Sequence, residues 1–350
     1  MELEQKTTKF ITSDKINYYP KELHYWLDGK TELITPITVE LHPSNMCNND
    51  CVYCFAKQQR DGAMLSHEDS MVILEKLGQM NVKGLILSGG GEPTMSPHFI
   101  DIIKEAKKQG MEVGVITNGL LVKDDIAKAI LEDCTWVRFS LDTVDRKMYA
   151  KIRGVDALPL VLDNLEKLVM EKKATGSKCT IGTQTVVTRD NYTQLAQTAS
   201  KLSYLEVDYY QIRPLENEFY SKALQDGIIS HIEVAKRIET DQTKILVSGK
   251  WGIVNPHTNL KDRGYSECHC YPMIGAIDAH AKIHICCHFV GQKKYEYGHM
   301  VDDSIKDILT KREVVAKRIK MADCPMACRG NQINIRMEGL KRGCEHVAFL

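Results

Sequence analysis

The chain has 350 residues, enough for one large domain or for a barrel with an appended module. Its 46 basic and 46 acidic residues balance, which disfavours partners recognised through a global field, such as nucleic acid or an acidic membrane surface. No apolar run of about 18 residues predicts a membrane span, and the first residues do not resemble a signal peptide. We therefore expect a cytoplasmic protein that binds neither nucleic acid nor a membrane.

The N-terminal stretch, residues 1–35, is polar and aromatic and predicts a short helical extension. An amphipathic helix is expected over residues 21–27, ended by Gly29. Its apolar side chains Leu23, Trp26 and Leu27 are expected to face a core.

Three cysteines with the spacing C-x3-C-x2-C, namely Cys47, Cys51 and Cys54, follow an apolar run at residues 37–41. A closed zinc site needs a fourth ligand, usually from a second pair at short range, and neither His42 nor His67 has such spacing. Iron-sulfur clusters are held by thiolates, and a cluster with only three protein ligands keeps one iron open. We interpret the loop as such a site, with zinc or ordinary core thiols as the alternatives. Twelve cysteines without a secretory start also indicate a reducing compartment.

Strand and helix patterns alternate over residues 36–215, which is typical of a parallel sheet covered by helices. Six βα units predict an α/β fold, a partial (β/α)6 TIM-like barrel whose chemistry is built at the carboxyl ends of the strands. The pattern weakens over residues 216–266, which we interpret as a linker or cap. Residues 267–350 are expected to form a separate C-terminal module.

Polar or glycine-rich positions follow several of the predicted strands. Each of these positions has an alternative interpretation. Glycines alone usually mark turns, and the polar residues after the third and fourth strands, Asn118 and Asp142, could instead cap helices. Arg153, which follows the next helix, could instead be a solvated surface residue. The candidate site residues are Gly89, Gly90, Gly91, Glu92, Asn118, Ser140, Asp142, Arg153 and Arg213.

Seven of the twelve cysteines lie in the C-terminal module: Cys268, Cys270, Cys286, Cys287, Cys324, Cys328 and Cys344. A hairpin-like alternation at residues 276–285 separates the first two groups. A helix over residues 305–319 is expected to deliver Cys324.

The cysteine loop, with Tyr53 before its last thiol, and the Gly-Gly-Gly-Glu-Pro loop one βα unit later resemble the radical S-adenosylmethionine (AdoMet) superfamily. The C-terminal cysteines resemble the auxiliary-cluster module of its SPASM/twitch branch, so the resemblance covers about residues 35–344. Two departures are Ala281, where the module's hairpin usually has glycine, and Val315 with Arg318 in place of a C-x2-C pair.

This resemblance implies three cofactors: a 4Fe-4S cluster on Cys47, Cys51 and Cys54, AdoMet, and an auxiliary 4Fe-4S cluster. In the family the glycine loop and its Glu bind the AdoMet amino group, the backbone of Phe55 would meet adenine, and Asn118, Ser140 and Asp142 suit the ribose and the carboxylate. Arg153 would contact the AdoMet carboxylate or the substrate, and we expect both Arg153 and Arg213 to be catalytic. The auxiliary cluster is expected on Cys268, Cys286, Cys324 and Cys328, with Cys270, Cys287 and Cys344 as substitutes and zinc as the alternative metal.

The expected function is abstraction of hydrogen from a small natural-product-type molecule, a carbohydrate, aminocyclitol or nucleoside, giving dehydrogenation or decarboxylation. In size and single auxiliary module the chain resembles enzymes of the 2-deoxy-scyllo-inosamine dehydrogenase and cytosylglucuronate decarboxylase type. A flavodoxin or ferredoxin would supply electrons. One alternative is a peptide maturase that makes a thioether, a carbon-carbon crosslink or an epimer, although the N-terminal extension is short for a leader-binding domain. Another is an iron-sulfur or zinc binding protein without catalysis.

Overall fold

The computed structural model describes residues 13–215, 221–252, 263–325 and 328–343, and a single sheet runs through it. The strand order is β10-β9-β8-β1-β2-β3-β4-β5-β6-β7. Strands β1 to β7 pair in parallel, β8 is parallel to β1, and β8, β9 and β10 pair antiparallel. The strands are β1 (Thr38–Leu41), β2 (Gly84–Leu87), β3 (Glu112–Thr117), β4 (Trp136–Ser140), β5 (Thr180–Val187), β6 (Tyr209–Pro214), β7 (Lys244–Val247), β8 (Ile274–Ile277), β9 (Lys282–His284) and β10 (Glu296–His299).

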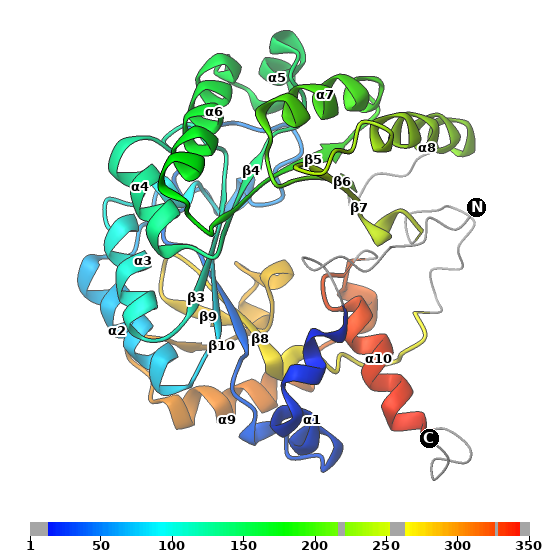
Figure 1. The fold of residues 1–350 in the computed structure, drawn as a ribbon. Helices are drawn as coiled ribbons and strands as arrows, with labels where there is room; N and C mark the ends of the chain where they lie inside the picture. Colours follow the sequence, from blue (N-terminus) through cyan, green and yellow to red (C-terminus); the bar gives the residue numbers. More distant parts are fainter. Residues whose placement is uncertain (1–12, 216–220, 253–262, 326–327, 344–350) are drawn as a thin grey trace.

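The helices between the parallel strands form an arc on the outer side of the curved sheet (Figure 1). None of the helices in the described residues is long and apolar enough to cross a membrane. Their bounds are α1 (Pro20–Leu27), α2 (His67–Gln79), α3 (Phe99–Lys108), α4 (Asp124–Asp133), α5 (Arg146–Arg153), α6 (Leu158–Thr175), α7 (Leu195–Leu205), α8 (Lys222–Lys236), α9 (Ile305–Ala316) and α10 (Asn331–Arg342).

The strands carry apolar side chains toward the helices, and a mixture of polar and apolar side chains toward the concave face. Leu85 and Leu87 on β2 and Val113 and Val115 on β3 are completely buried in the main core, which includes residues of the covering helices. Burying each such side chain stabilises the fold by about 1.5–3 kcal/mol. Because side chains alternate along a strand, the intervening positions face the inside of the arc, as Ile116 on β3 does. The predicted partial barrel is confirmed.

The floor of the barrel is filled by two aromatic rings that lie over glycines of neighbouring strands. A Cβ atom on Gly114 would lie 2.1 Å from the Trp136 ring, and one on Gly182 would lie 2.1 Å from the Tyr209 ring. Any larger residue at either glycine would push its ring out of the barrel. The floor therefore leaves space for a ligand only toward the carboxyl ends of the strands.

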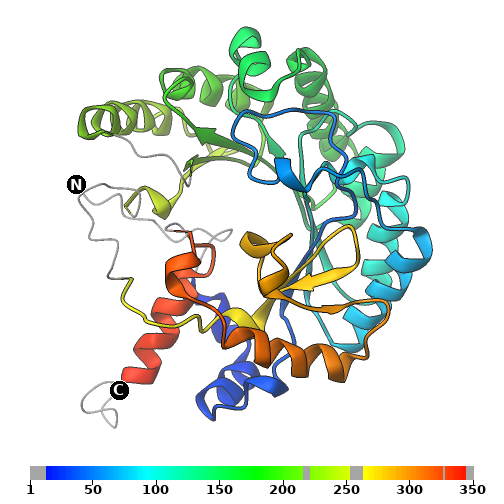
Figure 2. The ribbon, with the colours of Figure 1, turned by 180° about the vertical axis from the view of Figure 1, so that it is seen from behind.

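The C-terminal module continues the barrel sheet. Strand β8 pairs with β1 in register from Thr38–Ile274 to Leu41–Ile277, and the hairpin formed by β8 and β9 extends the sheet beyond it. Helix α9 packs on β10 and lies next to α2, at the end of the helical arc that is far from α8 (Figure 2). On the opposite edge β7 adds a seventh parallel strand, within the segment expected to be a linker or cap.

The N-terminal extension packs on the C-terminal module. Leu23 and Trp26 of α1 contact a small core of Ile16, Ile34, Met273 and Met337. Arg312 on α9 is fully buried and donates hydrogen bonds to the carbonyls of Ile34 (2.7 Å) and Thr31 (2.7 Å). The expectation that Leu27 faces a core is wrong, because it lies at the end of α1 and is 57% exposed.

Candidate active site

The cysteine loop, residues 47–54, follows β1 and is tied by its backbone to the end of α5. The amide of Asp50 donates to the carbonyl of Arg153 (2.9 Å), and that of Val52 donates to the carbonyl of Ile152 (3.0 Å). Gly154 ends the helix with a φ of +69°, and a Cβ atom there would lie 2.6 Å from the carbonyl oxygen of Asp50. The Arg-Gly element therefore holds the cysteine loop against the barrel.

The glycine loop, residues 89–91, packs against the segment that leads into the cysteine loop. Gly91 donates to the carbonyl of Ser44 (3.0 Å), and Glu92 donates through its amide to the carbonyl of Met46 (2.7 Å). A Cβ atom on Gly91 would lie only 2.0 Å from the oxygen of Met46. The glycine at position 91 thus has a steric reason independent of any ligand: it allows the two loops to lie side by side.

The carboxylate of Glu92 is buried and bonded within the protein. It accepts from the hydroxyls of Thr94 (2.6 Å) and Thr117 (2.6 Å) and from the amide of Asn118 (2.8 Å). Burial raises the pKa of Glu92, although these donors oppose the shift. The side chain joins the ends of β2 and β3, and its role toward an ammonium group stays a prediction.

Asp142 and Arg153 form a buried ion pair beneath the cysteine loop. The Nε atom of Arg153 lies 2.7 Å from Oδ2 of Asp142, and the Tyr53 hydroxyl donates to the same oxygen (2.5 Å). Burial alone would lower the pKa of Arg153, but the charge of Asp142 beside it raises this pKa well above the usual range. Arg153 is therefore not a surface residue, and Asp142 positions Arg153 and Tyr53 rather than lining the cavity described below.

Each sulfur of the cysteine loop has a donor directed at it. Cys47 accepts from the amide of Asn49 (3.5 Å), Cys51 lies 3.7 Å from Nη1 of Arg153, and Cys54 lies 3.3 Å from Nη2 of Arg60. Arg60 was not expected from the sequence. Burial raises the pKa of Cys47 and of Cys51, and the charges of Arg60 and Arg153, respectively, oppose this rise. The thiolate is the form that binds metals. Across the described ranges, no three His, Cys, Asp or Glu side chains are arranged to hold a single metal ion.

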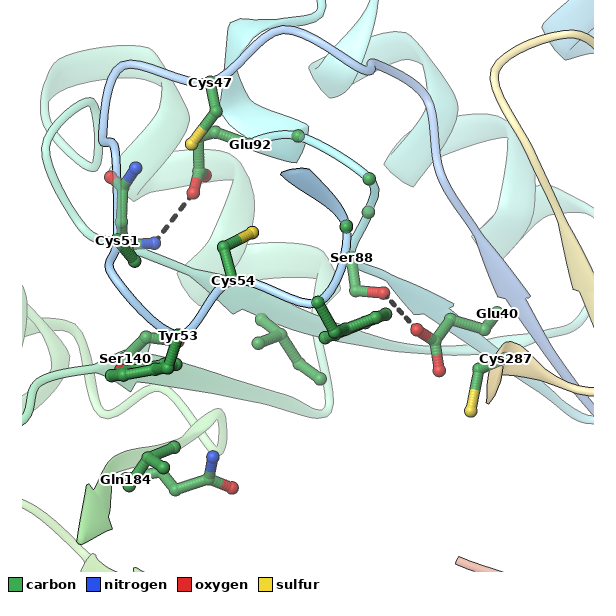
Figure 3. A pocket seen from close by; sticks show the side chains of 18 of the residues that line it. Glu40, Cys47, Cys51, Tyr53, Cys54, Ser88, Glu92, Ser140, Gln184 and Cys287 are labelled. Atoms are coloured by element: carbon green, nitrogen blue, oxygen red, sulfur yellow. Dashed lines mark hydrogen bonds between the residues drawn. The ribbon is translucent and has the colours of Figure 1, made fainter. Parts of the chain in front are cut away.

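One cavity of about 730 Å³ lies between the carboxyl ends of the strands and the C-terminal module (Figure 3). Most of the residues predicted from the sequence line it: Cys47, Cys51, Cys54, Phe55, Gly89, Gly90, Gly91, Glu92, Asn118, Ser140, Arg153, Arg213 and Cys324.

Sequence reasoning missed several polar residues of this cavity, above all Glu40 on β1. Glu40 accepts from the Ser88 hydroxyl (2.5 Å) and from Arg329 of the C-terminal module (2.5 Å), and its carboxylate faces the cavity (Figure 3). Its position between the buried Val39 and Leu41 was the available signal, because alternation directs it inward. Arg138, Lys250 and Cys287 also line the cavity and were not assigned to it.

Residues 41–202 match the family model described as the Radical SAM superfamily. This stretch is a radical SAM superfamily domain. Among curated proteins, a tungsten-containing aldehyde ferredoxin oxidoreductase cofactor-modifying protein of Pyrococcus furiosus is 30% identical over 205 residues, 57% of this chain and 58% of that protein. A probable GTP 3',8-cyclase of Saccharolobus islandicus is 30% identical over 128 residues, 36% of this chain and 41% of that protein. The match therefore spans little more than half of the first relative and less than half of the second.

Solved structures of radical SAM enzymes share the fold over most of the chain. Streptococcus suis SuiB matches with a TM-score of 0.65 and 17% identity, covering 85% of this chain and 72% of that one. The enzyme anSMEcpe with bound AdoMet matches with a TM-score of 0.61 and 15% identity, covering 86% and 88%. Both belong to the SPASM/twitch branch, so the resemblance to that branch is confirmed at the level of the fold.

Radical SAM enzymes use a 4Fe-4S cluster and AdoMet, and the residues of the cavity fit both groups. Cys47, Cys51 and Cys54 would hold the cluster, because their sulfurs open onto the cavity and each has a hydrogen-bond donor directed at it. The glycine loop exposes backbone beside them, where AdoMet would bind.

A second, small and mostly apolar cavity in the C-terminal module gathers the remaining cysteines. It is lined by Cys268, Cys270, Cys286, Cys287, Cys324 and Cys328, so all four predicted ligands of the auxiliary cluster meet at one place. The sulfurs of Cys268 and Cys270 lie 3.8 Å apart. Burial raises the pKa of Cys286 well above its ordinary value, and the nearby thiols Cys287, Cys328 and Cys268 add to this. The donor set fits the auxiliary cluster of the SPASM/twitch branch.

The other cysteines lie apart from both sites. Cys134 and Cys179 are buried in the main core of the barrel, as expected for packing residues. Cys344 lies outside the described residues. Cys287 and Cys324 line both cavities, and these two thiols therefore connect the auxiliary site to the active-site cavity.

Proposed function

We propose that this radical SAM enzyme abstracts hydrogen from a small natural-product-type molecule, a carbohydrate, aminocyclitol or nucleoside, and converts it by dehydrogenation or decarboxylation. When bound, the 4Fe-4S cluster and AdoMet supply a 5'-deoxyadenosyl radical for this abstraction. The chain's own residues supply orientation, exclusion of water and charge.

The observation that carries the proposal is the size of the cavity. Its volume of about 730 Å³ lies within the range of single small-molecule sites, about 300–1,000 Å³. AdoMet and the cluster need part of this space, so the remainder suits one small metabolite. Residues of the C-terminal module, including Cys287, Pro325 and Arg329, line the same cavity as the cysteine loop and would narrow the access of water to it.

The polar lining suits a hydroxylated molecule. Ser140 and Gln184 project into the cavity (Figure 3), and Arg213 lies at the end of β6. We assign Arg213 to the substrate, Ser140 and Asn118 to AdoMet, and Arg153 to positioning of the cysteine loop. Backbone of Phe55 and of the glycine loop completes the AdoMet site.

The auxiliary cluster would hold its position next to the substrate through Cys268, Cys286, Cys324 and Cys328. When bound, an auxiliary cluster would supply an electron acceptor for a dehydrogenation, and the expected electron donor to the protein is a flavodoxin or ferredoxin. Cys287 lines both cavities, and this proximity supports the assignment of the auxiliary cluster as the electron acceptor.

The second candidate is modification of a peptide. The fold of SuiB, which has been solved with its precursor peptide SuiA, covers most of this chain. The structure of anSMEcpe has also been solved with a peptide. A peptide maturase would act on a side chain inserted into the same cavity.

The test is formation of 5'-deoxyadenosine by anaerobically reconstituted protein with AdoMet and dithionite. We expect wild type to form it, small carbohydrates or nucleosides to increase the rate, and the Cys47→Ala/Cys51→Ala/Cys54→Ala variant to form none. Cys134→Ala, which changes a buried thiol of the barrel core, should retain the activity. Stimulation by peptides alone would favour the maturase. Failure of the iron-loaded wild type to cleave AdoMet would favour a non-catalytic iron-sulfur or zinc protein.

A further inference from the structure

Three guanidinium groups from distant parts of the chain line the active-site cavity on the side of the barrel interior. Arg138 lies on β4, Arg213 ends β6, and Arg329 follows Cys328 in the C-terminal module. Burial lowers the pKa of Arg138, and the nearby charges of Arg329 and Arg213 lower it further, although Tyr209 and Glu40 oppose the shift. A concentration of like charge is costly unless an anion compensates it.

The acidic side chains that line this cavity are already engaged. Glu40 binds Arg329 and the hydroxyl of Ser88. The carboxylate of Glu92 accepts hydrogen bonds from two threonine hydroxyls and a backbone amide. Asp323 accepts from Lys294 (2.7 Å) and from the Tyr295 hydroxyl (2.6 Å). Among the described residues that line the cavity, these three are the carboxylates, and none of them forms an ion pair with Arg138.

The contacts of Arg138 are with neutral groups. Its Nη1 atom donates a long hydrogen bond to Oε1 of Gln211 (3.4 Å), its side chain is hydrogen-bonded to that of Tyr209, and its guanidinium lies 5.8 Å from the centre of the Trp136 ring. Its Nε atom is buried and has no hydrogen-bond partner within the part of the chain that the structure describes. Arg138 as a whole is partly buried and faces the cavity. A guanidinium in such a position is suited to bind a planar or tetrahedral anion through two parallel hydrogen bonds.

The position of Arg138 separates it from the residues assigned to AdoMet. Arg138 and Ser140 point to the same face of β4, but Arg138 lies two residues earlier, about 7 Å deeper in the barrel. Ser140 and Arg153 lie nearer the cysteine loop. The anion at Arg138 would therefore belong to a second molecule below AdoMet.

We infer that Arg138, with Arg213 and Arg329 beside it, binds a carboxylate or phosphate of the substrate, so that the substrate is an anionic sugar or nucleoside derivative and not an aminocyclitol. This inference rests on the proposed function, because it describes the substrate of the same site. An aminocyclitol would place ammonium groups beside the guanidiniums of Arg138 and Arg213, and the resulting repulsion opposes binding.

The test compares three ligands with the same ring, D-glucuronate, D-glucose 6-phosphate and D-glucose. Calorimetric titrations use the holoenzyme reconstituted with iron and sulfide and saturated with AdoMet. We expect at least one anion to bind about tenfold or more tightly than glucose, which corresponds to one charge-assisted contact. The anion that binds more tightly distinguishes a carboxylate from a phosphate. Equal affinity for all three ligands, or binding of neither anion, would overturn the inference.

Variants locate the effect. Arg138→Gln should lose the preference for the anion, Arg138→Lys should keep part of it, and Arg146→Gln should keep all of it. Arg146 is a suitable control because it lies exposed on α5 and pairs with Asp156. An unchanged preference in Arg138→Gln would refute the role of Arg138. A loss of AdoMet affinity in Arg138→Gln would assign this arginine to the AdoMet carboxylate and would equally overturn the inference.

The two proposals fail separately. Absence of 5'-deoxyadenosine together with a retained, Arg138-dependent preference for anions would remove the radical chemistry but keep the anion site. Formation of 5'-deoxyadenosine without any such preference would keep the enzyme and remove the anionic substrate.

Discussion

The guanidinium of Arg153 is held between two loops by the carboxylate of Asp142, 2.7 Å from its Nε atom. The same arginine reaches the sulfur of Cys51, and its carbonyl oxygen accepts from the amide of Asp50. One residue thus connects the end of β4, the end of α5 and the cysteine loop. The stability of the pair and the geometry of the cluster site are therefore coupled.

Replacing Arg153 by Leu should destabilise the protein and weaken cluster binding together. The buried Asp142 would lose its counter-ion, at a cost of about 3–5 kcal/mol, and Cys51 would lose a donor. Thermal unfolding and iron per chain after reconstitution measure both effects. The double variant Arg153→Leu/Asp142→Leu should regain part of the stability but not the iron. Arg146→Ala, which breaks an exposed pair, should cost less than about 1 kcal/mol. Full iron loading in Arg153→Leu would contradict the coupling.

The part of the site that could be predicted is local in the sequence. Cys47, Cys51 and Cys54 lie within one loop, and the glycine loop follows the next strand, so spacing and strand order bring them together. The pair Glu40–Arg329 joins residues 289 positions apart and depends on the pairing of β1 with β8. No local pattern encodes that pairing.

Packing requirements were also hidden from the sequence. The sequence predicts that Gly91 binds a ligand, but in the structure a side chain at this position would first collide with the carbonyl of Met46. Ala281, noted as a departure from the usual hairpin glycine, adopts a φ of +59°, the left-handed conformation that glycine would accommodate more easily. Asp278 supports this turn, since its carboxylate accepts from the amides of His280 and Lys282.

Substitution of Gly91 by Ala should displace the cysteine loop. The new methyl group would overlap the carbonyl of Met46, a backbone atom that cannot turn away, and the expected cost is about 1–3 kcal/mol. Iron loading and the yield of 5'-deoxyadenosine should fall. Gly339→Ala is the matched control, because Gly339 lies in α10 with open space around its Cβ position. There alanine should stabilise the helix by up to about 1 kcal/mol. Equal behaviour of the two variants would show that the contact with Met46 does not constrain the loop.

The auxiliary site should distinguish two adjacent cysteines. Cys286 lines only the cavity of the C-terminal module, whereas Cys287 also lines the active-site cavity. We expect Cys286→Ala to lose about four irons per chain, the content of one 4Fe-4S cluster, and Cys287→Ala to retain them. Iron and sulfide analysis with Mössbauer spectra measures this. The reverse result would make Cys287 the ligand and leave Cys286 as a packing residue.

The pair Glu40–Arg329 should make stability depend on pH. Burial alone would raise the pKa of Glu40, but Arg329 and His42 hold it well below its ordinary value. Because the pKa of this carboxyl is lowered in the folded state, its contribution is complete above the ordinary value of about 4.3 and is lost as the pH falls through the lowered pKa. Arg329→Gln should therefore cost about 1.5–3 kcal/mol at pH 7 and much less in acid, where Glu40 is protonated. Urea unfolding at pH 7 and at a pH below the lowered pKa of Glu40 measures the difference in the free energy of unfolding. The control is Lys167→Gln, which breaks the exposed pair between Lys167 and Asp163. A loss of the same size at both pH values would show that Arg329 contributes packing and not charge.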